Sequence, residues 1–233
     1  MEALVSFDKI ILAIHVFAGF TSLVLFWLPL LVRKGGNLHV KIGWTYTYMM
    51  WGVVITSIIL SIVNIIQGGY VISLFLGYLS LITAMPLWFG IVILKYKKGV
   101  PEKIYNKRRL LYSAIVIMGA INVAFAVANN FQGLSMVLFI FGMLGLTDIK
   151  NVRMSYEKFQ SEVDPIKDHI RGLLTTGIAA YTAFFAFGGR TWLGEIFSGQ
   201  LMVIPWVMPT VLGVIAIKWF TRKWVKKPAA KIA

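Results

Sequence analysis

Residues 10–41 read IILAIHVFAGFTSLVLFWLPLLVRKGGNLHVK, an apolar run that is followed directly by a short basic turn. A helix of roughly 20 apolar residues crosses a hydrocarbon core of about 30 Å, because each residue rises about 1.5 Å. The run is too long for the apolar region of a cleaved signal peptide, and the residues before it carry Glu2 and Asp8 against one lysine. We therefore interpret residues 10–32 as a retained membrane helix.

Six further apolar runs follow, at residues 42–66, 70–94, 110–129, 132–149, 166–189 and 200–221. The chain of 233 residues is 58% hydrophobic and 14% charged, against about 25% charged residues in soluble domains. The runs are continuously apolar, which favours helices over the alternating strands of an outer-membrane barrel. The sequence therefore predicts an all-α fold, an integral membrane bundle of seven transmembrane helices in a single domain over residues 1–233.

Basic residues gather in four polar gaps between the runs. Residues 33–41, 95–109, 150–171 and 218–231 hold 21 of the 23 lysines and arginines. Cytoplasmic loops retain Lys and Arg during insertion, so the N-terminus is expected outside a bacterial inner membrane and the C-terminus in the cytoplasm. The same charges favour anionic lipid headgroups as partners over nucleic acid. Residues expected to contact lipid phosphates or a haem propionate are Arg33, Lys34, Lys41, Arg109 and Arg171.

The gaps also suggest internal similarity. Residues 31–35 (Leu-Val-Arg-Lys-Gly) resemble residues 95–99 (Lys-Tyr-Lys-Lys-Gly), and residues 39–41 (His-Val-Lys) resemble residues 169–171 (His-Ile-Arg). Three related helical hairpins closed on the cytoplasmic side, plus one further helix, would produce this pattern. A general likeness among basic turns would produce it too. At the helix starts, we expect Asn37 to cap the second helix and Asp164, before Pro165, to cap the sixth.

His39 and His169 are the candidate cofactor ligands. Both are expected at the cytoplasmic starts of helices, where the positive helix end favours the neutral ring. A neutral imidazole is the form that binds a haem iron or a metal. The pattern predicts a ligand pair for haem b or a divalent metal; the alternative is two polar side chains near lipid headgroups. The chain has no cysteine, which excludes disulfides, iron–sulfur clusters and thiol catalysis.

Several polar residues lie within the apolar runs, where they are costly. The residues expected to line a polar cavity are His15, Asn64, Asn122, Thr176 and Tyr181. Each has the alternative role of an interhelical hydrogen bond. His15 is expected roughly 9 Å from the middle of its helix, in the outer leaflet, at a site for a quinone or a proton. The acidic residues do not fall in mid-membrane, which disfavours an ion-coupled pump.

Two stretches carry a family resemblance. His15-x-x-x-Gly19, with the later Lys34-Gly35-x-x-x-His39-x-x-x-Gly43, resembles the opening of a family of bacterial multi-pass membrane proteins. Residues 169–189 are similar to a later helix of that family. The resemblance implies a multi-pass membrane fold and implies no particular activity. A looser likeness is to haem-b electron-transfer bundles, which place histidines near helix ends.

Together these patterns favour a cofactor-binding or redox bundle with a cytoplasmic-side histidine pair. The alternative is a small-molecule transporter or lipid-binding membrane protein, in which the seventh helix bends at Pro205 and Pro209. A membrane-embedded hydrolase is disfavoured because no compact ligand set is visible. The sequence assigns no catalytic residue.

Overall fold

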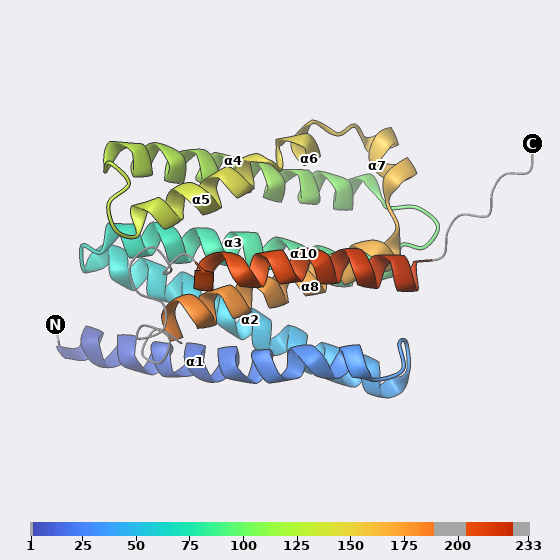
Figure 1. Cartoon of the computed structure of the whole chain (residues 1–233), viewed down its shortest axis with the longest axis horizontal. Helices are drawn as coiled ribbons and strands as arrows, with labels where there is room; N and C mark the ends of the chain where they lie inside the picture. Colours follow the sequence, from blue (N-terminus) through green and yellow to red (C-terminus); the bar gives the residue numbers. More distant parts are fainter. Residues whose placement is uncertain (1, 189–203, 226–233) are drawn as a thin grey trace, which may run out of the picture. The chain divides into compact units, whose positions relative to one another are not determined.

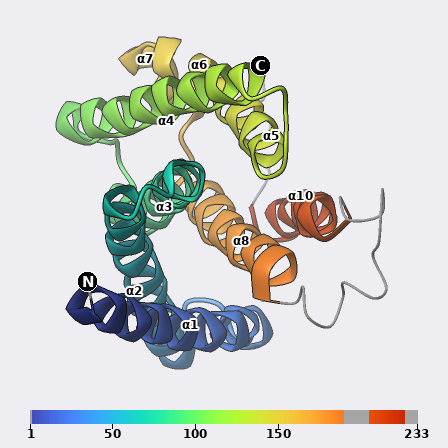
Figure 2. The ribbon, with the colours of Figure 1, turned by 90° about the vertical axis from the view of Figure 1, so that its left-hand side faces the viewer.

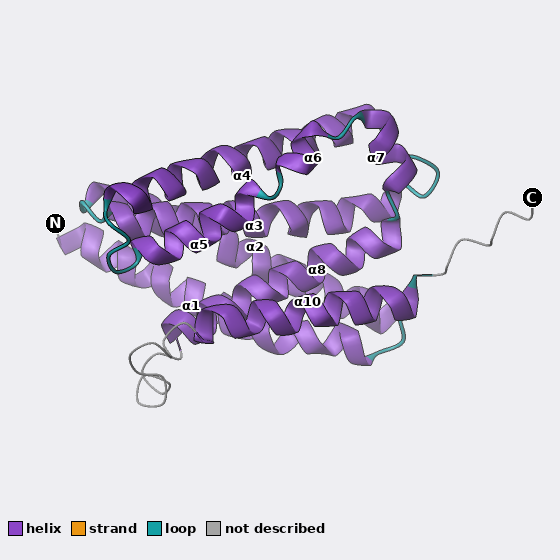
Figure 3. Ribbon diagram, turned by 45° about the horizontal axis from the view of Figure 1, so that its top comes forward, coloured by secondary structure: helices purple, strands orange, loops and turns teal. Residues whose placement is uncertain are grey.

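Helices make up all the regular structure that the computed structural model describes, which covers residues 2–188 and 204–225 (Figure 3). Seven helical segments in these residues are long and apolar enough to cross a membrane. They are Ser6–Leu31, Asn37–Ile66, Tyr70–Lys95, Glu102–Ala128, Ser135–Arg153, Pro165–Gly188 and Ile204–Trp224. The all-α prediction and the seven apolar spans are confirmed for this part of the chain.

The individual helices differ from the apolar runs mainly at their ends. They are α1 (Glu2–Leu31), α2 (Asn37–Ile66), α3 (Tyr70–Val92), η1 (Ile93–Lys95), α4 (Glu102–Ala128), α5 (Ser135–Leu146), α6 (Ile149–Arg153), α7 (Tyr156–Glu162), α8 (Pro165–Ala183), η2 (Phe184–Gly188) and α10 (Ile204–Trp224). Helix α4 begins well before residue 110, because polar first turns remain helical outside an apolar run. The expected run 132–149 divides into α5 and α6. The end of the sixth expected run and the start of the seventh lie outside the described residues.

The two predicted helix caps have different outcomes. Asp164 caps α8: its Oδ1 accepts a hydrogen bond from the Lys167 backbone N–H at 2.9 Å, and Pro165 follows at the first helical position. The prediction for Asn37 is wrong. Asn37 is already the first residue of α2, and Gly36 occupies the cap position without a side-chain hydrogen bond. The turn is closed by the backbone instead, with the Gly36 N–H donating to the Arg33 carbonyl at 3.2 Å.

The described chain divides into two compact units. Unit one comprises Met1–Met85 and Pro101–Ser161, and unit two comprises Pro86–Val100 and Glu162–Ala233. Helix α3 therefore contributes its first part to unit one and its last turns to unit two.

In unit one, α1 packs along α2, and α4 packs along α5 (Figures 1 and 2). The hydroxyl of Ser61 on α2 donates to the Ser73 carbonyl of α3 at 2.8 Å. Helices α4 and α5 approach closely at two glycines, because a Cβ atom built on Gly142 would lie 2.7 Å from the Gly119 carbonyl oxygen. Small residues and short hydroxyl side chains thus set the helix spacing in this unit, as is common in membranes.

In unit two, α8 crosses the end of α3 at a pair of glycines. A Cβ atom on Gly172 would lie 2.5 Å from the Pro86 carbonyl oxygen and 2.9 Å from the Gly90 Cα. Helix α10 packs on α8, where the missing side chain of Gly213 makes room for Ile178. The α8–α3 crossing needs glycine because backbone atoms are in contact, whereas Gly213 leaves space for the Ile178 side chain.

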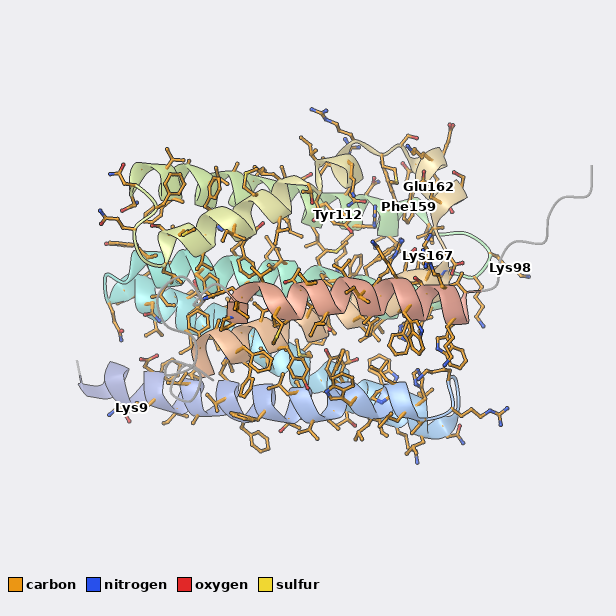
Figure 4. The ribbon with its side chains drawn as sticks, viewed as in Figure 1. Lys9, Lys98, Tyr112, Phe159, Glu162 and Lys167 are labelled. Carbon is orange, nitrogen blue, oxygen red and sulfur yellow. The ribbon has the colours of Figure 1, made fainter. Side chains whose placement is uncertain are left out.

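Basic residues lie at one end of each unit. In unit one, the turn after α1, the start of α4, and helices α6 and α7 share an end, whereas the turn around Gly68 lies at the other (Figure 1). In unit two, the basic end holds the turn after η1, with Lys98, and the start of α8, with Lys167 (Figure 4). Lys9 lies at the opposite end of unit one from its basic turns (Figure 4). The charge asymmetry read from the sequence is thus also an asymmetry in space within each unit.

Candidate functional sites

His39 in unit one forms a hydrogen bond with the C-terminal end of the neighbouring helix α1. Its Nδ1 lies 3.1 Å from the Pro29 carbonyl oxygen, near the C-terminus of α1. A carbonyl only accepts hydrogen bonds, so Nδ1 carries the proton and donates it. The last carbonyls of a helix lack intrahelical partners, and Lys34 Nζ also donates to the Pro29 and Leu30 carbonyls, at 2.7 Å each. In the neutral His39 ring the lone pair is therefore on Nε2.

His169 in unit two makes the same kind of hydrogen bond. Its Nδ1 lies 2.8 Å from the carbonyl oxygen of Gly90 near the end of α3. The close approach of Gly90 and Gly172 brings the two helices within reach of this bond. The neighbouring Asp168 accepts from the Asp164 backbone N–H at 3.2 Å and lies 3.9 Å from Arg171. Asp168 therefore completes the start of α8, and Gly90 orients the imidazole.

The two predicted ligands belong to different units, His39 to unit one and His169 to unit two. Among the described residues, no three His, Cys, Asp or Glu side chains are grouped as a metal site would require. The histidine pair stays a prediction, and the shared Nδ1 hydrogen bond is what the structure adds to it.

The basic residues predicted to contact phosphates or propionates are mostly exposed. Arg33, Lys41 and Arg109 are exposed, and the Arg171 side chain is 52% exposed. Lys34 differs, because its ammonium group already binds the carbonyls at the end of α1. Lys34 therefore has a defined role as a helix-end cation.

His15 is partly exposed on α1, where it faces α2. Its Nδ1 lies 2.9 Å from the Thr56 hydroxyl oxygen. The Thr56 hydroxyl itself lies 2.7 Å from the Gly52 carbonyl oxygen and 3.1 Å from that of Val53. The sequence reading gave His15 but not Thr56.

The other residues predicted for a polar cavity each have a separate local setting. Asn64 donates to the Leu60 carbonyl at 2.8 Å in its own helix, and the Thr176 hydroxyl donates to Leu173 at 2.7 Å. Asn122 is fully buried in unit one, and neither polar atom of its amide has a hydrogen bond. The Tyr181 ring lies beside that of Phe185 in a tilted arrangement, with ring centroids 6.2 Å apart. His15, Asn64 and Asn122, which all lie in unit one, do not hydrogen-bond to one another.

A buried arginine in unit one is the site that the sequence reading missed. Arg108 on α4 is 7% exposed, and its guanidinium lies over the rings of Tyr112 and Phe159, at 4.6 and 4.9 Å. Tyr112 and Phe159 are labelled in Figure 4. It donates to Asn151 Oδ1 at 3.0 Å, and Asn151 Nδ2 donates to Asp148 at 2.7 Å. These contacts tie α6 and α7 to α4. The sequence did contain a signal for this site, because Arg108 is spaced at helical intervals with the other buried residues of α4, such as Tyr105 and Ile115.

Comparisons with protein-family models, with curated proteins and with solved structures find no match to this chain. The functional proposals therefore depend on its residues and their geometry.

Proposed function

We propose that this protein is a multi-pass protein of the bacterial cytoplasmic membrane that binds haem b or a divalent metal through His39 and His169. The observation that supports the proposal is the shared hydrogen bond, in which each ring donates Nδ1–H to a backbone carbonyl near a helix end. Histidines that bind a metal almost always donate their other ring N–H to a carbonyl, a carboxylate or water. That bond fixes the ring orientation and makes Nε2 the ligating nitrogen.

The proposed orientation places the N-terminus outside and the C-terminus in the cytoplasm. It follows from the basic end of each unit, since Lys and Arg are retained on the cytoplasmic side. Both histidines lie near such basic ends. Exposed Arg33, Lys41 and Arg171 then supply positive charge for haem propionates or for anionic headgroups. A bound haem would supply one-electron chemistry, and the histidines would position it.

The test is an absorption spectrum and metal analysis of the purified protein, oxidised and dithionite-reduced. We expect a Soret band that shifts on reduction, or a stoichiometric divalent metal. Either His39→Ala or His169→Ala should remove it, whereas His15→Ala should leave it unchanged. Circular dichroism checks that each variant is still folded. A colourless and metal-free wild-type protein would overturn the proposal.

A second candidate function is transport or lipid binding, and one feature of unit two favours it. Helix α8 ends in the π-helical turn η2, and Phe187 of this turn packs edge-on against Trp206 of α10, at 5.2 Å. Helix α10 contains Pro209, which removes a backbone hydrogen bond. Irregular helices of this kind are common at functional sites. If this function is correct, Pro209→Ala should slow the exchange of fluorescent phosphatidylglycerol between leaflets of proteoliposomes, and an unchanged rate would argue against it.

A further inference from the structure

The motif His15-x-x-x-Gly19 has no part in the proposed haem or metal site. His15 lies on α1 and Thr56 on α2, and both belong to unit one. One turn away, a Cβ atom built on Gly52 would lie at van der Waals distance, 3.5 Å, from the Ala18 Cβ. The two helices are therefore in contact beside the hydrogen bond between His15 and Thr56.

The hydrogen bonds around His15 define which ring nitrogen carries the proton. The Thr56 hydroxyl has one proton, which the Gly52 carbonyl oxygen accepts at 2.7 Å. The Thr56 oxygen is then left to accept from His15 Nδ1–H at 2.9 Å. In the neutral ring, Nε2 is consequently a hydrogen-bond acceptor.

The His15 side chain is partly exposed, and the hydrogen bond to Thr56 uses Nδ1 and not Nε2. The flanking Leu12 and Val16 are 49% and 45% exposed, so the ring is surrounded by apolar surface. An acceptor in such surroundings suits a hydroxyl group on a molecule that is dissolved in the bilayer.

Gly19 provides room beside this acceptor. Residues four apart on a helix lie on the same face, one turn from each other. A Cβ atom built on Gly19 would meet nothing within 4 Å. The face of α1 is therefore open at Gly19, one turn from His15.

We infer that His15 and Gly19 bind a lipophilic quinol, with one quinol hydroxyl donating to His15 Nε2 and the ring lying over Gly19. The site favours a quinol over a quinone, because a quinone offers only acceptors to a nitrogen that is itself an acceptor. This inference concerns binding and is independent of the proposed haem or metal.

The experiment uses 15N-histidine-labelled protein in phosphatidylcholine nanodiscs, where the three histidines of the chain give three sets of ring signals. The His15 signals are assigned with His15→Gln. Adding decylhydroquinone should shift His15 Nε2 and leave the other two rings unchanged. Its dimethyl ether, which has no hydroxyl proton, should bind roughly 10-fold more weakly. Equal shifts with the two compounds would overturn the inference, and so would an equal shift with dioleoylglycerol, since any lipid hydroxyl would then suffice.

Matched glycine variants separate binding from folding. In Gly19→Leu the new Cβ meets no neighbour within 4 Å, so the fold should persist and the quinol-dependent shift should disappear. In Gly43→Leu on α2 the new Cβ likewise meets no neighbour within 4 Å, and this variant should keep the shift. Equal behaviour of the two variants would contradict the inference. His39→Ala and His169→Ala should keep the quinol response, so failure of the haem or metal proposal and failure of this one are distinguishable.

Discussion

At the scale of single residues, the three histidines share one hydrogen-bonding arrangement. Nδ1 of His15 donates to Thr56, that of His39 to the Pro29 carbonyl and that of His169 to the Gly90 carbonyl. Each ring is thus fixed by an oxygen atom on another helix. With the proton on Nδ1, the lone pair of each neutral ring is on Nε2.

We predict that Thr56→Val destabilises unit one by about 1–2 kcal/mol, because the His15 N–H loses its acceptor inside a membrane helix pair. The measurement is the free energy of unfolding in mixed micelles. In a double-mutant cycle, Thr56→Val should cost less when His15 is replaced by Leu. An equal cost in both backgrounds would show that the valine acts through packing and not through the hydrogen bond.

The partners of these histidines were predictable to different degrees. His15 lies 20 residues before Gly35, and Thr56 lies 20 residues after Gly36. In two antiparallel helices joined by a turn, residues equally far from the turn lie side by side, because the rise per residue is the same in both helices. The contact between His15 and Thr56 can therefore be predicted from the position of the turn. The acceptors of His39 and His169 are backbone carbonyls, which every residue type has, so the sequence does not identify them. The sequence also could not show that the side-chain amide of Asn122 lacks hydrogen bonds, because the residue type shows only that the side chain is polar.

At the scale of helices, glycine pairs determine which segments pack. Gly172 of α8 touches the backbone of α3 at Pro86 and Gly90, and Gly142 of α5 touches that of α4 at Gly119. The sequence of α8 contains several small residues, namely Gly172, Gly177, Ala179, Ala180 and Ala183, which indicate a face suited to close packing. It did not show which helix that face contacts, because small residues permit close approach without selecting a partner.

Gly172→Ala should destabilise unit two by about 1–3 kcal/mol, since the new methyl group meets backbone atoms that cannot rotate away. Gly43→Ala is the matched control on α2, where a Cβ meets nothing within 4 Å. It should stabilise its helix by about 0.5–1 kcal/mol. Thermal unfolding of the two variants in the same detergent tests the difference, and equal melting temperatures would refute the close contact.

At the scale of the whole molecule, the charge distribution is the strongest sequence signal. Apolar length predicted seven spans, and the described residues contain seven helices that meet that criterion. Helix α5 ends at Leu146 and α6 begins at Ile149, so the break falls at the polar pair Thr147 and Asp148, where the sequence also indicates the end of the fifth span. The orientation with the N-terminus outside stays a prediction.

Orientation is directly measurable, because the chain has no cysteine and each introduced one gives a single label. In intact cells, a membrane-impermeant maleimide should label Gln67→Cys, which lies at the end without basic turns. Lys98→Cys should be protected until the membrane is permeabilised. The reverse pattern would invert the topology, and labelling of both before permeabilisation would contradict a membrane-spanning arrangement.

The hydrogen bonds of His39 and His169 also differ in when they can form during synthesis. His39 is synthesised 10 residues after its acceptor Pro29, and His169 is synthesised 79 residues after its acceptor Gly90. At about 5–20 residues per second, the first bond can form within about 2 seconds of translation, and the second only after about 4–16 seconds. The end of α3 therefore spends that interval in the bilayer before α8 exists, whereas the hairpin of α1 and α2 can close almost as it emerges.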